Sequence, residues 1–235
     1  MVEIHQVSEH ELPILLQWLK EHLPLTWKLY GTLREQLRGK WQGTTFCTLG
    51  WPDILAVGEG PINEDICKVV GHYTDPRRTT VFAPEPAHAR DFLTWPGFID
   101  WSQPVIFHML SLPVASIIKT LSQQAGCPSP KTIPLTLLTA NSGDIKYRDG
   151  TCLGAEMGTE WGFIGMLYVT SSARGRGLGK LLTCRLAEKY FEEDLPAVVV
   201  TSVDNTESIC LHESLGFQQE CQLNLMYHTP DNINK

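Results

Sequence analysis

The sequence predicts an α/β (α+β) protein in which one mixed α/β domain follows another. Short β-branched or apolar runs of strand length alternate with segments whose apolar residues recur at helical spacing, and both halves of the chain contain both kinds of segment. A glycine-rich loop with three cationic residues joins a predicted strand, residues 164–169, to a predicted helix, residues 178–191. With 235 residues, the chain is long enough for two small domains that each have a core.

The first half of the chain predicts a domain over residues 1–126. Ser8 and Glu11 form a capping box before a helix whose apolar face holds positions 12, 15, 16, 19 and 23, and Pro24 ends this helix. Strands are expected at residues 27–33, 54–57, 79–83 and 105–109, and a second helix at the apolar positions 114, 117, 118 and 121. Two X-Pro pairs within residues 127–131 disfavour helix and predict a linker.

The second predicted domain covers residues 132–235. Strands are expected at residues 133–139, 152–156, 164–169 and 197–203, with the helix at residues 178–191 between the last two. A short helix follows, which Asp204, Asn205 or Thr206 can cap and Gly216 ends. No amphipathic helical pattern occurs between Lys131 and Trp161.

The glycine-rich loop has the composition of a cradle for pyrophosphate. Glycines without Cβ atoms let the backbone approach a ligand, and the N–H groups at a helix start favour an anion. A P-loop would require glycine at Arg174 and serine or threonine at Leu181, and a dinucleotide fingerprint would require glycine at Lys180. Both alternatives fail. The loop residues are Arg174, Gly175, Arg176, Gly177, Leu178, Gly179 and Lys180.

Arg174, Gly177 and Gly179 form the pattern R-x-x-G-x-G, which resembles the CoA-binding signature of the GNAT superfamily of N-acetyltransferases. The segment from Asn205 to Phe217 resembles the second signature of that superfamily. The resemblance implies a GNAT-type mixed sheet flanked by helices, and acyl-CoA or acetyl-CoA as co-substrate. It implies that the following residues border the CoA: Leu167, Tyr168, Val169, the seven loop residues 174–180, Asn205 and Ser208.

The first half of the chain resembles the N-terminal domain of the glycine N-acyltransferase family. The residues that carry this resemblance are Leu23-Pro24, residues 28–32 (KLYGT), Trp51-Pro52-Asp53, His72-Tyr73-Thr74 and Phe98-Ile99-Asp100-Trp101. It implies an enzyme that transfers an acyl group to the amine of glycine or another small amino acid. A GNAT domain normally opens with a strand and two helices that wall the acceptor site, and this chain has no helical pattern there. Either the N-terminal domain supplies that wall, or the chain is a shortened variant with an incomplete site. Two alternatives therefore stay open: a GNAT enzyme with a polyamine, arylalkylamine or protein N-terminus as acceptor, and a truncated, non-enzymatic CoA-binding relative.

The resemblance also implies the positions of the catalytic groups. Phe163 stands where the family has its basic carboxylate, and Glu160 is the nearest acid. The odd offset between them places Glu160 on the other face of a regular strand, although a single bulge would restore it. An exposed, non-catalytic Glu160, a base at Glu156 and a water alone are the other possibilities. His212 stands where tyrosine usually protonates the leaving thiolate; it can exchange a proton near neutral pH, or serve structure alone.

Composition argues against several other functions. The net charge of −7, with 43% hydrophobic and 19% charged residues, is typical of a globular protein that does not bind nucleic acid. No apolar run approaches the ~20 residues of a membrane span. Seven cysteines without a C-x-x-C pair predict free thiols and no metal site. The first residues lack the features of a signal or transit peptide, which predicts an intracellular protein, cytoplasmic, or mitochondrial by family resemblance alone. The expected partner is a small-molecule amine, and the sequence does not indicate an oligomeric state.

Overall fold

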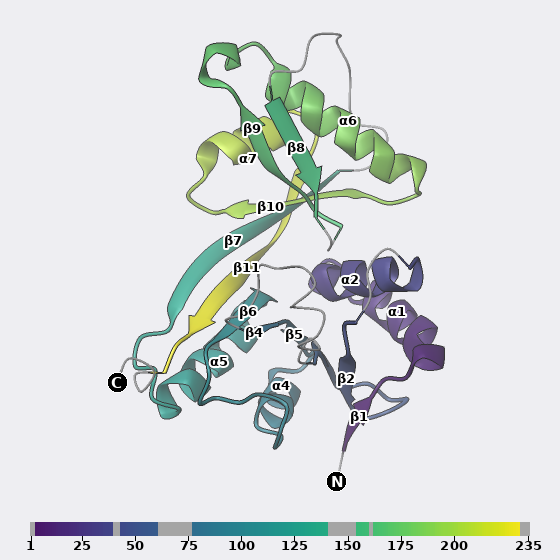
Figure 1. Cartoon of the computed structure of the whole chain (residues 1–235), viewed down its shortest axis with the longest axis vertical. Coiled ribbons are helices and arrows are strands. Elements are labelled where there is room, and N and C mark those ends of the chain that lie inside the picture. The colour runs from purple at the N-terminus through teal and green to yellow at the C-terminus, as the bar shows by residue number, and fades with distance from the viewer. Residues whose placement is uncertain (1–2, 40–42, 61–76, 141–153, 160–161, 231–235) are drawn as a thin grey trace. The chain divides into compact units, whose positions relative to one another are not determined.

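The computed structural model describes residues 3–39, 43–60, 77–140, 154–159 and 162–230 (Figure 1). The chain folds as two compact units: unit 1 comprises Met1–Pro134 and Leu223–Lys235, and unit 2 comprises Leu135–Gln222. Both units mix helices and strands, which confirms the predicted fold class. Residues 223–235 belong to unit 1, whereas the sequence-based division into domains assigned them to the second domain.

Unit 1 consists of short strands and four helices within its described residues. Its strands are β1 (Ile4–Gln6), β2 (Phe46–Leu49), β3 (Ala56–Glu59), β4 (Arg77–Thr79), β5 (Val81–Phe82) and β6 (Val105–Leu110). Its helices are α1 (Leu12–Glu21), α2 (Trp27–Leu37), α4 (Pro86–Leu93) and α5 (Leu112–Gln124), with the 3-10 turn η1 (Glu9–Glu11) before α1.

Two sheets organise unit 1. The first is antiparallel with the order β1-β2-β3-β5. In the second, β6 pairs in parallel with β4 and antiparallel with the end of β11 (Gln218–His228). The apolar faces of α1 and α2 pack on the first sheet through Leu15, Leu19, Leu29 and Leu33, all of which are fully buried. Unit 1 therefore has its own core, as predicted.

The predicted strand at residues 27–33 is wrong, because these residues form α2. Leu29 and Leu33, four residues apart, are buried together, and the Thr32 hydroxyl donates to the Lys28 carbonyl oxygen at 2.9 Å. Both relations have helical spacing. The aromatic and β-branched residues of this segment favoured a strand, but nearly every residue from 27 to 34 is buried, so buried and exposed positions do not alternate as in a half-buried strand. The predicted helices at α1 and α5 and the predicted strand at β6 are confirmed.

Unit 2 contains most of the elements that follow the linker, whereas residues 131–134 of the first strand belong to unit 1. They are β7 (Lys131–Ala140), β8 (Gly154–Gly158), β9 (Ile164–Val169), the 3-10 turn η2 (Ser171–Ala173), α6 (Leu178–Glu192), β10 (Ala197–Ser202), α7 (Thr206–Glu213) and the first part of β11. The strand order is β11-β7-β10-β9-β8. The predicted strands and helices between residues 164 and 213 coincide with β9, α6, β10 and α7.

The strands β9 and β10 separate shortly after they meet. They run parallel but pair at a single register position, Val199↔Ile164. β9 continues along β8 instead, where the register runs from Gly158↔Ile164 to Gly154↔Val169. The divergence leaves the β10-facing edge of β9 open beyond Ile164, and α6 packs against β8 and β9. β9 is therefore splayed away from β10, and the candidate site lies in the opening between them.

Candidate functional site

A cavity of about 940 Å³ lies at the divergence of β9 and β10. Its walls come from β8, β9, the glycine-rich loop, α6, β10 and α7. The structure brings to this cavity every predicted CoA-bordering residue except Arg176, which is exposed and does not line it. The predicted residues that line the cavity are Leu167, Tyr168, Val169, Arg174, Gly175, Gly177, Leu178, Gly179, Lys180, Asn205 and Ser208.

A bulge shapes the strand side of the cavity. Between the pairs Ala155↔Tyr168 and Met157↔Gly165, the register of β8 and β9 shifts by one residue. Met166 lies within this bulge with a φ of 59°, which is uncommon for a residue with a side chain. Because β9 has already left β10, backbone N–H groups here can face a ligand instead of a neighbouring strand.

The loop presents open backbone to the cavity. Gly175 and Gly177 have φ angles of 71° and 80°, and a Cβ added at either would meet no atom within 4 Å. Gly177 is the N-cap of α6, and its carbonyl accepts the Leu181 N–H at 3.1 Å. The N–H groups of residues 178–180 precede that first bond, so helix geometry leaves them for a ligand. This backbone, beside two cationic side chains, fits a pyrophosphate group.

Gly179 has a different role from the other two loop glycines. A Cβ at this position would lie 3.1 Å from Leu211 Cδ1 and 3.4 Å from Leu167 Cδ2. Glycine therefore allows α6 to pack closely on α7 and β9. Within the R-x-x-G-x-G pattern, Gly177 leaves the backbone accessible to a ligand, and Gly179 allows close helix packing.

Arg174 connects the loop to the end of β9. Its Nε donates to the Val169 carbonyl oxygen at 3.1 Å, and its side chain borders the cavity. The guanidinium is therefore held beside the open glycine backbone.

Arg174→Ala is expected to weaken CoA binding about tenfold or more, because a charge-assisted hydrogen bond contributes roughly 1.5–3 kcal/mol. Calorimetric titration with CoA measures the effect. Arg185→Ala is the matched control: Arg185 also belongs to this region, but its side chain is 61% exposed, 3.6 Å from Glu188, and outside the cavity lining. Equal CoA affinity in the Arg174 variant and the wild type would contradict the pyrophosphate assignment.

His212 lies on α7 at the cavity and is only 3% exposed. Its Nδ1 lies 2.7 Å from the Ser208 carbonyl oxygen, which can only accept, so the proton resides on Nδ1. Nε2 is buried and has no hydrogen-bond partner among the described residues. Burial lowers the pKa of His212, against the opposing effect of the Ser208 hydrogen bond. A neutral ring therefore presents Nε2 as an acceptor, and a proton can leave from this atom only when the ring is doubly protonated.

Asn205 caps the N-terminus of α7, the helix that carries His212. Its Oδ1 accepts the Ser208 N–H at 3.1 Å, so Asn205 is the N-cap among the three residues, 204–206, that the sequence predicts as possible caps. Asn205 and Ser208 both border the cavity, so the cap also fixes this wall.

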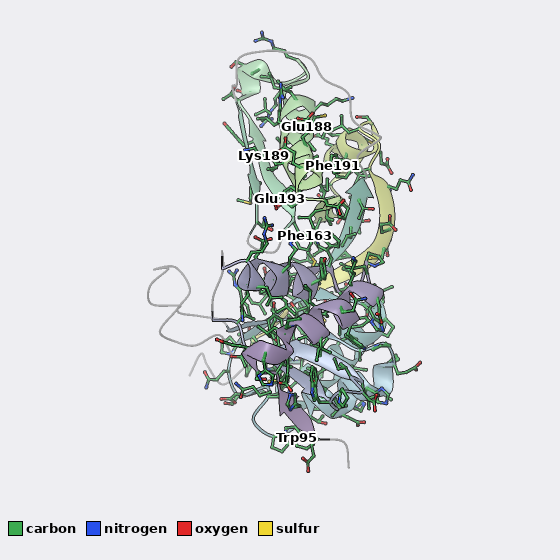
Figure 2. The ribbon with its side chains drawn as sticks, turned by 90° about the vertical axis from the view of Figure 1, so that its right-hand side faces the viewer. Trp95, Phe163, Glu188, Lys189, Phe191 and Glu193 are labelled. Atoms are coloured by element: carbon green, nitrogen blue, oxygen red, sulfur yellow. The ribbon has the colours of Figure 1, made fainter. Side chains whose placement is uncertain are left out.

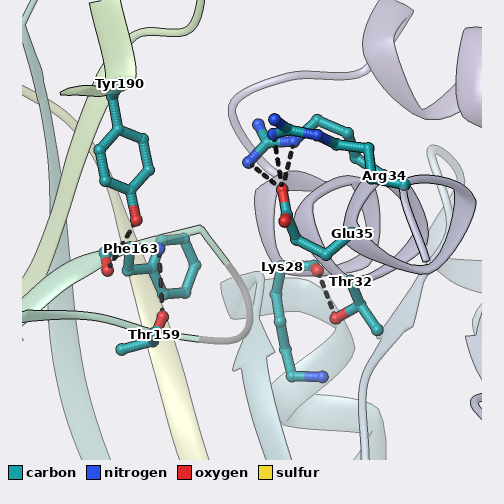
Figure 3. Close-up of polar contacts among 8 residues, drawn as sticks. Lys28, Thr32, Arg34, Glu35, Thr159, Phe163 and Tyr190 are labelled. Atoms are coloured by element: carbon teal, nitrogen blue, oxygen red, sulfur yellow. Dashed lines mark hydrogen bonds and ion pairs between the residues drawn. The ribbon is translucent and has the colours of Figure 1, made fainter. Parts of the chain in front are cut away.

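Glu160, the predicted base, lies outside the described residues. Thr159, the last described residue before it, donates its N–H to the Phe163 carbonyl oxygen at 2.7 Å, and its hydroxyl accepts the Phe163 N–H at 3.1 Å (Figure 3). The Tyr190 hydroxyl donates to the same carbonyl at 3.4 Å. Phe163 is 4% exposed and lies beside the C-terminal part of α6, so a core side chain stands where the sequence resemblance predicts the position of a carboxylate (Figure 2).

Two acids of the described residues line the cavity, Glu156 of β8 and Glu207 of α7. Glu156 is the one that lies on a strand. The Thr183 hydroxyl donates to its Oε1 at 3.2 Å, while Oε2 is buried without a hydrogen-bond partner among the described residues. Burial raises the pKa of Glu156 from 4.5 to about 7, against the lowering effect of Thr183. Sequence reasoning retained Glu156 only as an alternative base; its place as the one acid of β8 was the available signal.

Neither a metal centre nor a membrane span is found in the described part of the chain. No three of its histidine, cysteine, aspartate and glutamate side chains are grouped so that they could hold a metal ion. None of the helices formed by these residues has both the length and the apolar character needed to cross a bilayer.

Parts of this chain are similar to known protein families. The family model described as "FR47-like protein" matches residues 150–225, from before β8 into β11. A rat protein named glycine N-acyltransferase-like protein Keg1 is 26% identical over 114 residues, which cover 48% of this chain and 38% of the rat protein. Bovine glycine N-acyltransferase is 25% identical over 111 residues, 47% of this chain and 37% of its own length. The matched region thus spans well under half of these relatives.

Solved structures share the fold. An X-ray structure of a Drosophila protein superposes with a TM-score of 0.79 at 14% identity and covers 98% of this chain and 100% of its own. A GCN5-related N-acetyltransferase from Sphaerobacter thermophilus superposes with a TM-score of 0.55 at 10% identity, covering 96% and 94% of the two chains. At these identities the likeness shows the fold alone.

Proposed function

This chain is a GNAT-fold relative of the glycine N-acyltransferases, and on that premise we propose that it is an acyl-CoA-dependent N-acyltransferase. The proposed reaction transfers the acyl group of acyl-CoA or acetyl-CoA to the amine of glycine or another small amino acid. The observation that carries the proposal is one cavity with an open glycine backbone at the loop and two titratable groups in its walls, the half-buried Glu156 and the buried His212.

Different residues along the cavity would bind the co-substrate and stabilise the reacting groups. Bound acyl-CoA supplies the activated thioester. Arg174, Lys180 and the N–H groups at the start of α6 would hold its pyrophosphate. Backbone N–H groups at the β9 bulge would polarise the thioester oxygen, and such oriented donors stabilise a developing oxyanion. The amine would attack from the part of the cavity that these groups leave open.

His212 is proposed to protonate the leaving thiolate. The nitrogen available for this step is Nε2, since Nδ1–H is engaged with the Ser208 carbonyl. The donor form is the imidazolium. Because burial lowers the pKa of His212 below its ordinary 6.5, that form is populated on the acidic side of neutrality.

His212→Phe is therefore expected to lower turnover much more than CoA affinity, and to remove a limb of the pH–rate profile. The limb falls as pH rises through the His212 pKa, because the donor form is lost. His212→Tyr should keep much of the activity, since a phenol can also donate a proton. Full activity in the phenylalanine variant would assign His212 to packing against Phe217, whose ring centroid lies 5.2 Å away.

Release of free thiol tests the whole proposal. Acetyl-, benzoyl- and long-chain acyl-CoA donors are each combined with glycine, other amino acids, a polyamine, an arylalkylamine and a peptide N-terminus. Thiol release that depends on glycine supports the proposed acceptor class, and release with another amine alone replaces that acceptor. Calorimetric binding of CoA without thiol release for any pair would identify a truncated, non-enzymatic CoA-binding relative instead.

We expect an intracellular location, cytoplasmic, or mitochondrial by resemblance to the family.

A further inference from the structure

Glu156 occupies a special register position on β8. The pairs Ala155↔Tyr168 and Met157↔Gly165 flank it, so this single residue faces two residues of β9, Met166 and Leu167. These are the residues of the bulge, where Met166 has a φ of 59°. Because β9 leaves β10 after Ile164, Glu156 lies beside the stretch of β9 that opens onto the cavity.

The carboxylate of Glu156 is held at one oxygen only. Oε1 accepts from the Thr183 hydroxyl at 3.2 Å, whereas Oε2 is buried and makes no hydrogen bond with the described residues. A buried carboxylate oxygen without a partner is costly unless a ligand satisfies it. The ligand group that complements it is an N–H donor.

We propose that Glu156 is the catalytic base of this enzyme, acting from the strand next to the one that carries the family's carboxylate. The proposal rests on the proposed function. As the amine nitrogen forms its bond to the thioester carbon, Oε2 takes a proton from that nitrogen. The carbon–sulfur bond breaks, its electron pair leaves with sulfur, and one proton reaches the thiolate from His212 or water. Glu156 then returns its proton to solvent.

Thr183 is the positioning residue for this carboxylate. Its hydroxyl lies 3.2 Å from Glu156 Oε1 and 3.1 Å from the Gly179 carbonyl oxygen, but it has one proton to donate. When Glu156 is ionised, Thr183 can donate to the carboxylate. When Oε2 carries the proton, Oε1 is a weaker acceptor, and Thr183 can donate to the Gly179 carbonyl oxygen instead. One side chain thus serves both protonation states through which a base must pass.

The groups around Glu156 and its burial set its pKa in a range that suits a general base. The titratable groups that share its cavity are Lys180 of α6, Tyr168 of β9, and His212 and Glu207 of α7. The pKa of the Cys184 thiol on α6 is raised, mainly by burial and in second place by the nearby charge of Glu156. The shift of Glu156 itself to about 7 comes from burial, so the carboxylate form is gained as pH rises through neutrality.

The test compares Glu156→Gln with a matched control, Glu220→Gln. Glu220 also accepts a threonine hydroxyl, from Thr139 at 2.7 Å, but it is exposed and outside the cavity lining. The preferred acceptor found by thiol release is the substrate, and turnover is measured against pH. Glu156→Gln should lower turnover about 10²–10⁴-fold and abolish the limb that rises through about pH 7, with partial recovery at high pH where the free amine is abundant. CoA affinity should stay within about twofold of the wild type, and Glu220→Gln should behave as the wild type.

Thr183→Val and Thr183→Ser separate positioning from structure. Thr183 lowers the pKa of Glu156, so valine should move the rising limb to higher pH and reduce turnover less than Glu156→Gln does, while serine restores both. A Glu156→Gln variant that keeps the wild-type limb, or that loses CoA affinity in parallel with turnover, overturns the proposal. So does a loss of the limb in Glu160→Gln with no change in Glu156→Gln. In each of these outcomes the wild-type protein still catalyses acyl transfer, so the proposed function stands and only the role of Glu156 is rejected. A wild-type protein that binds CoA without releasing thiol would reject both the proposed function and the role of Glu156.

Discussion

Gly177→Val is expected to weaken CoA binding by at least about a hundredfold, because two or more hydrogen bonds of roughly 1.5–3 kcal/mol each would be lost. Gly177 has a φ of 80°, a conformation that a β-branched residue adopts only with strain. Relief of that strain moves the N-cap of α6, and with it the N–H groups that the pyrophosphate requires. The added side chain would also stand where the backbone is open now.

The control for this change is Gly39→Val in unit 1. Gly39 has a φ of 72° and, like Gly177, open space around an added Cβ. It is therefore matched for backbone strain and lies far from the cavity in sequence. Thermal unfolding should show similar losses of stability in the two variants, and calorimetry should show normal CoA binding in Gly39→Val alone. Normal affinity in a folded Gly177→Val protein would refute the cradle.

Lys28→Met is expected to destabilise unit 1 by about 3–5 kcal/mol, because removal of one partner leaves a buried charge uncompensated. The Lys28 ammonium donates to Glu59 Oε2, and the two side chains are 4% and 6% exposed. The other oxygen, Oε1, has no hydrogen-bond partner among the described residues. Lys28 also belongs to the packed face of α2, where Thr32 donates to its carbonyl oxygen (Figure 3). Methionine keeps most of the volume of lysine, so the loss reports the charge.

Urea unfolding measures this effect, with two further variants as controls. Arg185→Met removes one partner of an exposed pair and should change stability by no more than about 1 kcal/mol. Lys28→Met combined with Glu59→Leu removes both buried charges and should recover most of the lost stability. A Lys28→Met protein as stable as Arg185→Met would show that the pair contributes little to unit 1.

Much of the fold around the loop could be predicted because its signals are local. The strand β9, the helix α6 and the Asn205 cap depend on residues within one turn or one strand of each other. The same holds for α1, whose capping box has the Ser8 N–H donating to Glu11 Oε2 at 2.8 Å. Prediction failed where the local composition was misleading: α2 was expected as a strand from its aromatic and β-branched content, yet it is a helix that is buried on almost all sides from Trp27 to Arg34.

The sequence by itself determined the composition of the loop, the order of the elements around it and the resemblance to the GNAT superfamily. Only the tertiary structure decided which carboxylate borders the cavity. Glu156 is brought to the bulge by strand pairing, receives its hydrogen bond from Thr183 in another element, and has its pKa raised by burial. Likewise, the end of β11 pairs with β6 and joins unit 1, whereas sequence order alone assigned it to the second domain. Register, bulges and burial arise from contacts between distant residues, which no local pattern encodes.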